Sequence, residues 1–191
     1  MLLNDVIDHV RNRSYMGGVE RDKLRVKATG EVFTPTPLVQ EILDNISLDQ
    51  FTDPTKTFLD NSCGDGQFLG EVLIRKMENG STFEESLNTI YGVDIMIDNV
   101  DLCRERLLCG QNHLRHIVEK NIQCRDGLKF GYNFELMGKA RRNTEEKARI
   151  RQQKLKTKQE KLGKEEETKK KKAAQQKKLF GELIPEIHPS L

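Results

Sequence analysis

The chain has 191 residues, 36% of them hydrophobic, and 32 Lys and Arg side chains nearly balance 30 Asp and Glu. This composition fits one soluble domain with a modest core, and no run of apolar residues is long enough to cross a membrane. Because Asp5, Asp8 and Arg11 stand where a signal peptide needs an apolar stretch, we expect a cytoplasmic protein.

The charge distribution and the cysteine content further limit the class of protein. Residues 139–178 carry a net charge of +11, which leaves −9 for the rest of the chain, so an acidic body precedes a basic tail. The four cysteines show neither CxxC spacing nor paired His ligands, which disfavours a metal site or a disulfide framework and indicates reduced thiols.

The predicted elements of the body alternate between helix and strand. Apolar residues at helical spacing behind Thr36-Pro37 predict a helix over residues 37–47. A short strand over 56–60 leads through a glycine turn into a helix that includes residues 68–77. A second strand over 89–95, a helix over 98–109 and a third strand over 116–122 follow. Two strand–helix–strand crossovers predict an α/β fold with a parallel sheet and flanking helices.

The tail is expected to begin near Gly138, which gives a body over 1–138, a Lys-rich helical or disordered tail over 139–178 and a C-terminal segment over 179–191. Ala148, Leu155 and Leu162 are seven residues apart, but Lys169 breaks the repeat. Two interpretations stay open for the tail: a solvated helix, or a basic arm for nucleic acid or a protein partner. The apolar segment 179–184 is a candidate to dock on the body.

The strongest local signal is the turn that contains Gly64 and Gly66. Its glycines allow a tight bend and a close approach to a ligand at a helix N-terminus, although the same pattern also suits a turn that needs glycine only for geometry. Leu69 stands where a dinucleotide fingerprint has its third glycine, which argues against a nicotinamide cofactor. The carboxylates of Asp60 and Asp65 suit a ligand with an amino or sulfonium group rather than a pyrophosphate.

Two further carboxylates follow the later strands. Asp94, at the end of the second strand, is placed to bind two ribose hydroxyls, and the alternative is that it caps the next helix, a role for which Asp98 is better positioned. Asp126 follows the third strand. Asp60, Asp94 and Asp126 each end or follow a strand, and the carboxyl ends of parallel strands lie at one edge of the sheet. The sequence therefore predicts a nucleoside site at this edge.

Three segments together resemble a known family: TGEVFTPTPLVQEIL (29–43), FLDNSCGDGQFL (58–69) and IYGVDI (90–95). In order and spacing they are similar to the N-terminal part of S-adenosylmethionine-dependent adenine-N6 DNA methyltransferases of the restriction-modification type. The resemblance covers about residues 20–134 and implies a partial Rossmann-like methyltransferase fold. It also implies S-adenosylmethionine as cofactor and DNA as partner. The cofactor-binding residues it implies are Phe33, Thr34, Pro35, Asp60, Ser62, Cys63, Gly64, Gly66, Asp94, Ile95 and Asp126.

The sequence departs from this family at the catalytic motif. That motif, Asn or Asp followed by Pro-Pro and an aromatic residue, would follow a fourth strand, and no Pro-Pro pair occurs in these 191 residues. Asn133, between two aromatic residues, is the one weak catalytic candidate. We therefore expect a truncated member, or one half of a split enzyme whose partner chain supplies the missing strands and motif. The alternative is a non-catalytic accessory module that binds nucleic acid or protein.

Overall fold

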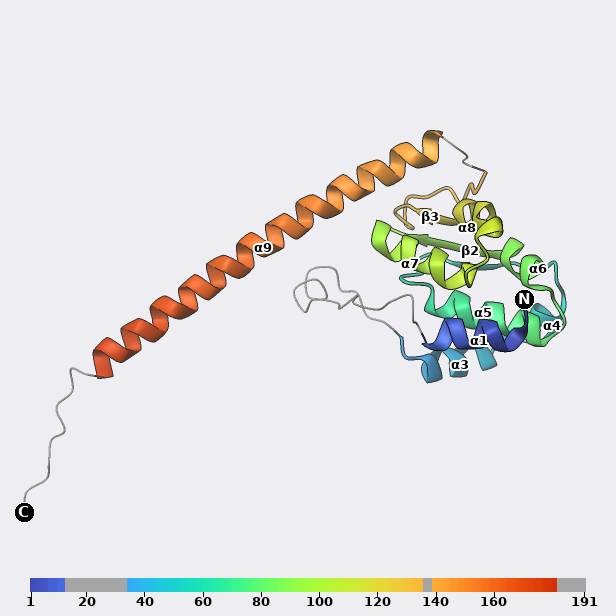
Figure 1. Ribbon diagram of the computed structural model, residues 1–191, viewed down its shortest axis with the longest axis horizontal. Coiled ribbons are helices and arrows are strands. Elements are labelled where there is room, and N and C mark those ends of the chain that lie inside the picture. Colours follow the sequence, from blue (N-terminus) through green and yellow to red (C-terminus); the bar gives the residue numbers. More distant parts are fainter. Residues whose placement is uncertain (13–33, 136–138, 182–191) are drawn as a thin grey trace, which may run out of the picture. The chain divides into compact units, whose positions relative to one another are not determined.

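The computed structural model describes residues 1–12, 34–135 and 139–181 (Figure 1). The chain divides into two units, Met1–Gln152 and Gln153–Leu191. None of the described helices has the length and apolar character needed to cross a membrane.

The first unit is built on a small parallel sheet. Its strands are β1 (Phe58–Asp60), β2 (Ile90–Asp94) and β3 (Ile122–Cys124), in the order β1-β2-β3. Both pairings are parallel, with Asp60 opposite Gly92 and Asp94 opposite Cys124. The predicted α/β class with a parallel sheet and flanking helices is confirmed. In the part of the chain that the structure describes, β1 pairs only with β2 and forms an edge of the sheet.

Helices connect the strands. After β1 come α5 (Gln67–Glu78) and α6 (Phe83–Asn88), and after β2 come α7 (Ile97–Leu108), a short 3-10 turn (Asn112–Leu114) and α8 (Arg115–Asn121). The helices predicted after the first two strands are confirmed. The strand predicted over 116–122 is wrong, because only Ile122 belongs to β3 and the preceding residues form α8. Leu114, Ile117, Val118 and Asn121 are buried at the spacing of one helical face.

Three N-terminal helices complete the layer around α5 (Figure 1): α1 (Leu3–Asn12), α3 (Thr36–Asp44) and α4 (Asp49–Thr52). The predicted helix over 37–47 is confirmed as α3, although it ends at Asp44. Arg11 of α1 donates two hydrogen bonds to the buried Glu71 carboxylate of α5, at 3.1 and 2.9 Å. This ion pair fixes α1 against α5. It joins residues 60 positions apart, so no local sequence pattern predicted it.

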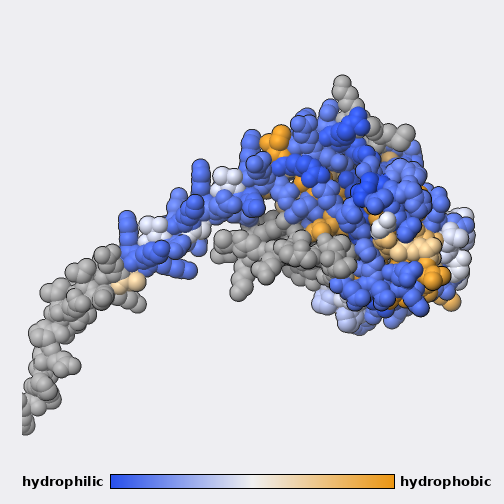
Figure 2. All heavy atoms as spheres, in the orientation of Figure 1, coloured by the Kyte–Doolittle hydropathy of each residue, from blue (hydrophilic) through white to orange (hydrophobic). Residues whose placement is uncertain are grey.

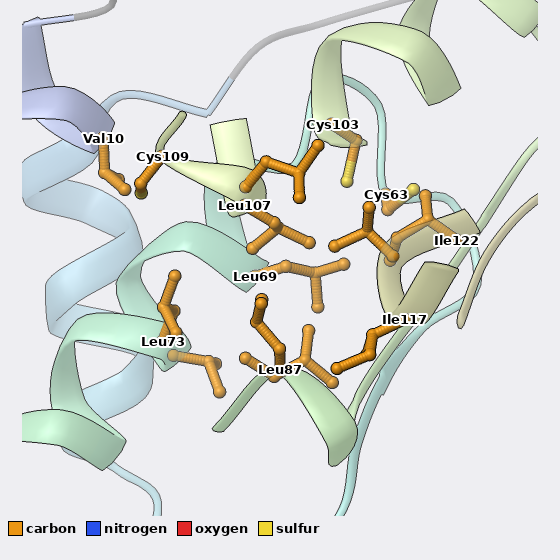
Figure 3. Packing of buried hydrophobic residues seen from close by; sticks show 14 of the residues in the cluster. Val10, Cys63, Leu69, Leu73, Leu87, Cys103, Leu107, Cys109, Ile117 and Ile122 are labelled. Atoms are coloured by element: carbon orange, nitrogen blue, oxygen red, sulfur yellow. The ribbon is translucent and has the colours of Figure 1, made fainter. Parts of the chain in front are cut away.

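The core lies between the sheet and helices α5 and α7. Figure 3 shows Leu69 of α5 in the centre of this core, between Leu107 of α7 and Ile122 of β3, with Leu73 of α5 at one side; all four are nearly without solvent exposure. All four cysteines are buried and free.

The other face of the sheet is covered by the segment after β3. The Phe134 ring packs on Tyr91 of β2, with ring centroids 4.8 Å apart, and its carbonyl accepts a hydrogen bond from Gln123 of β3. Leu59, on the same face of the edge strand, is 50% exposed. This face is thus covered over β2 and half open over β1.

The basic tail forms one helix, α9 (Lys139–Gly181). Its first turns belong to the body, since Arg141 pairs with Glu119 at 2.7 Å and Glu145 pairs with the buried Arg104 at 2.8 Å. The two compact units therefore divide after Gln152, later than the boundary expected near Gly138, a residue that lies outside the described ones. The segment 182–184, part of the proposed docking segment, also lies outside them.

Candidate functional site

Three loops leave the carboxyl ends of the strands at the same edge of the sheet. They comprise residues 61–66 after β1, 95–96 after β2 and 125–130 after β3. In open α/β sheets, ligands bind outside the carboxyl ends of the strands. The predicted carboxylates Asp60, Asp94 and Asp126 belong to this rim.

The glycine turn adopts backbone conformations that favour glycine. Gly64 has φ +53° and Gly66 has φ +83°, and α5 begins directly after Gly66. A Cβ atom on Gly66 would lie 2.6 Å from the Sγ atom of Cys103 in α7. Gly66 is therefore required by the turn conformation and by packing on α7, without any need to invoke a ligand.

Asp94 ties the first two loops together. Its Oδ2 atom accepts a hydrogen bond from the Gly64 N–H at 3.0 Å, and Oδ1 accepts one from the N–H of Met96, the residue before α7, at 2.7 Å. Asp98, which we expected to cap α7, accepts a bond from the neighbouring Asn99 N–H. Asp94 thus takes the helix-starting role as well, so a ribose would have to share or exchange these contacts.

The third loop packs directly on the glycine turn. A Cβ atom on Gly127 would lie 2.3 Å from the backbone oxygen of Asn61, so only glycine permits this approach. The Asp126 carboxylate accepts a hydrogen bond from the Leu128 N–H at 3.1 Å and pairs with Lys129 at 3.4 Å. Sequence reasoning did not single out Gly127, although an Asp-Gly pair directly after a strand is a recognisable signal of a close turn.

The two carboxylates of the glycine turn have different environments. Asp60 is partly exposed at the end of β1 and accepts a hydrogen bond from the Ser62 N–H at 3.0 Å. Burial raises the pKa of this carboxyl group, and the bond from Ser62 partly opposes that rise. Asp65 is fully buried and pairs with the equally buried Arg106 of α7 through contacts of 3.2 and 3.3 Å. The expectation that Asp65 faces a ligand is therefore wrong.

The Phe33-Thr34-Pro35 segment is described only in part, because Phe33 lies outside the described residues. Thr34 is partly buried and Pro35 is exposed directly before α3. The Gln67 amide donates a hydrogen bond of 2.7 Å to the Thr36 hydroxyl, which holds the start of α3 against the first turn of α5. Thr34 and Pro35 directly precede Thr36, which this contact holds beside Gln67, the residue that follows Gly66.

The remaining turn residues contribute unequally. The Cys63 thiol is buried beside that of Cys103 (Figure 3), and this thiol contact together with burial raises its pKa well above the usual value. The backbone N–H of Cys63 donates to the Val93 carbonyl at 3.0 Å. Cys63 is thus engaged by the fold rather than presented to a ligand. Ser62 is exposed, and Ile95 is 44% exposed.

The catalytic candidate Asn133 lies in the segment that covers the sheet. Its side-chain oxygen accepts a hydrogen bond from the Glu135 N–H at 3.0 Å, and the Tyr132 hydroxyl donates to the Gly127 carbonyl at 2.7 Å. Phe134 packs on Tyr91. In these contacts the Asn133 side-chain oxygen and the Phe134 ring serve the loop and the sheet themselves.

Among the described residues, no group of three or more His, Cys, Asp or Glu side chains is arranged to hold a metal ion. Comparison of the chain with protein-family models, with curated proteins and with solved structures finds no match.

Proposed function

We propose that the chain binds S-adenosylmethionine at the rim of the sheet, through a Rossmann-like domain related to the adenine-N6 DNA methyltransferases that its motifs resemble. The observation that carries this proposal is the convergence of separate segments at the ends of the strands. The bond from Gly64 to Asp94 joins the first two loops, and the contact of Gly127 with Asn61 joins the third.

The chemistry of the rim is compatible with the parts of this cofactor. The Asp60 carboxylate suits the positively charged amino or sulfonium group, because an adjacent cation offsets the cost of burying its charge. Asp94 is a hydrogen-bond acceptor for ribose hydroxyls once its present contacts are shared. Ile95, the next residue, offers an exposed apolar side chain against which a base could pack.

Calorimetric titration with S-adenosylmethionine and S-adenosylhomocysteine tests the proposal. We expect binding to the wild type and a loss of about 1 to 3 kcal/mol in Asp94→Ala, the usual cost of leaving buried polar groups unpaired. Asp98→Ala is the matched control, since it removes a neighbouring carboxylate outside the rim. Circular dichroism must show that both variants keep their helices. Equal affinities in wild type and Asp94→Ala would remove Asp94 from the site.

A second candidate function is an accessory module that keeps the shape of the rim without its ligand. It is favoured by one observation: the Asp94 carboxylate already serves the chain's own Gly64 and Met96. A methyl-transfer assay on unmethylated DNA, with and without candidate protein partners, separates the two functions. Methyl transfer that requires a partner supports the methyltransferase function. Absence of cofactor binding in the calorimetric titration, with or without a partner, supports the accessory module.

A further inference from the structure

Over residues 153–174, helix α9 carries most of its net positive charge on one face. Lys154, Lys158, Lys161, Lys169 and Lys172 recur three or four residues apart, with the interval between Lys161 and Lys169 divided by Glu165. Residues at this spacing lie one above another on an α-helix. The five lysines and Glu165 are all exposed, and Figure 2 shows the described part of α9 as predominantly hydrophilic. We call the five lysines the lysine face.

The acidic residues of this part of the helix are mostly elsewhere. Glu160, Glu166 and Glu167 lie on other sides of the helix, and Glu167 pairs with Lys171 at 2.7 Å, one turn away. Five lysines and a single glutamate leave the lysine face with a net charge of +4. Three of the four glutamates of residues 153–174 are therefore kept away from the lysine face, and the mixed charges of an ordinary solvated helix are confined to the other sides.

The apolar content of the helix argues against two other kinds of partner. Over residues 153–174, Leu155 and Leu162 are the only large apolar side chains. A helix that lies on a membrane needs a continuous apolar face opposite its charges, and a coiled coil needs several consecutive apolar heptads. Neither is present in this stretch.

We propose that the lysine face binds the phosphate backbone of double-stranded nucleic acid. From Lys154 to Lys172 the helix rises about 27 Å, at 1.5 Å per residue, alongside a duplex that carries one negative charge per roughly 1.7 Å of its axis. Since the chain outside residues 139–178 has a net charge of −9, the body repels such a polymer and the tail must supply the attraction. Lysine contacts to phosphate carry no base information, so the binding is independent of sequence.

Two variants of the full chain with equal charge test the proposal. The first replaces Lys154, Lys158, Lys161 and Lys172 by Gln. The second replaces Lys156, Lys164, Lys170 and Lys171, which lie on the other sides of the helix, by Gln. Gln has nearly the helix propensity of Lys, and circular dichroism checks that the helix persists. Binding to a short labelled duplex is measured by fluorescence anisotropy over a series of salt concentrations.

We expect the lysine-face variant to lose at least tenfold more affinity than the control. Its log–log salt slope should fall by up to roughly 0.9 for each lost phosphate contact, whereas the control should keep most of the wild-type slope. Equal losses in the two variants would overturn the proposal, and so would stronger binding to an acidic protein or to anionic vesicles than to the duplex. S-adenosylhomocysteine binding should be the same in both variants, because the lysine face is independent of the proposed cofactor site.

Discussion

Replacement of Gly127 by Ala tests the packing that brings the third loop to the glycine turn. The new Cβ atom would lie 2.3 Å from the backbone oxygen of Asn61, whereas ordinary contact begins at 3.4 Å. One of the two backbones must therefore move by about an ångström, since no flexible side chain is available to yield. Overpacking of this kind typically costs about 1 to 3 kcal/mol. Gly131, in the same segment, is the matched control, because a Cβ atom there has no neighbour within 4 Å.

Urea denaturation followed by circular dichroism measures both variants. We expect Gly127→Ala to lose about 1 to 3 kcal/mol of unfolding free energy and Gly131→Ala to remain within roughly 0.5 kcal/mol of the wild type. The displaced loop carries Asp126, so Gly127→Ala should also weaken binding of S-adenosylhomocysteine. Equal stabilities of the two variants would refute the close contact between the loops and remove the structural basis of the site.

Three further predictions concern the buried Asp65–Arg106 pair, the raised pKa of Asp60 and methyl transfer by the chain. Asp65→Ala removes the carboxylate that pairs with the buried Arg106 guanidinium and should cost about 3 to 5 kcal/mol of unfolding free energy. The double variant Asp65→Leu with Arg106→Met should recover most of that loss, and a small loss in Asp65→Ala would contradict the buried pair. Burial raises the pKa of Asp60 in the folded state, so the charged carboxylate lowers the stability of the protein at pH values above that pKa, and this cost disappears as the pH falls through it. Asp60→Asn should therefore raise the free energy of unfolding at neutral pH, measured by urea titration, and the gain should shrink in acid. The purified chain alone should transfer no labelled methyl group to DNA, because it lacks the Pro-Pro tetrapeptide, and transfer that is lost in Asn133→Ala would overturn this expectation.

The regular part of the fold was predictable because its signals are local. The glycine turn and the apolar spacing after it predicted α5, and a run of residues with high strand propensity predicted β2. The helix expected over 98–109 corresponds to α7. The approach to the third strand, in the second crossover, shows where this reasoning fails. Residues 116–122 include Ile117 and Val118, which suit either a strand or a helix, and the helical burial pattern becomes visible only when Leu114 and Asn121 are included.

The candidate site was predictable in position but not in the state of its side chains. Parallel strand ends bring Asp60, Asp94 and Asp126 to one rim wherever their strands are located correctly. Which carboxylate the fold itself uses depends on partners far away in the sequence. Arg106 neutralises Asp65 across 41 residues, and Gly64 reaches Asp94 across 30. No periodicity or short motif encodes such pairs.

Backbone amide NMR during titration with S-adenosylhomocysteine tests the central claim most directly, because it reports the position of the ligand without any substitution. We predict saturable shifts of the amides in all three loops, at Gly64, Gly66, Ile95 and Asp126, and no shifts in α9 over residues 153–174. Shifts confined to α9, or no shifts at saturating ligand, would contradict a cofactor site at the ends of the strands.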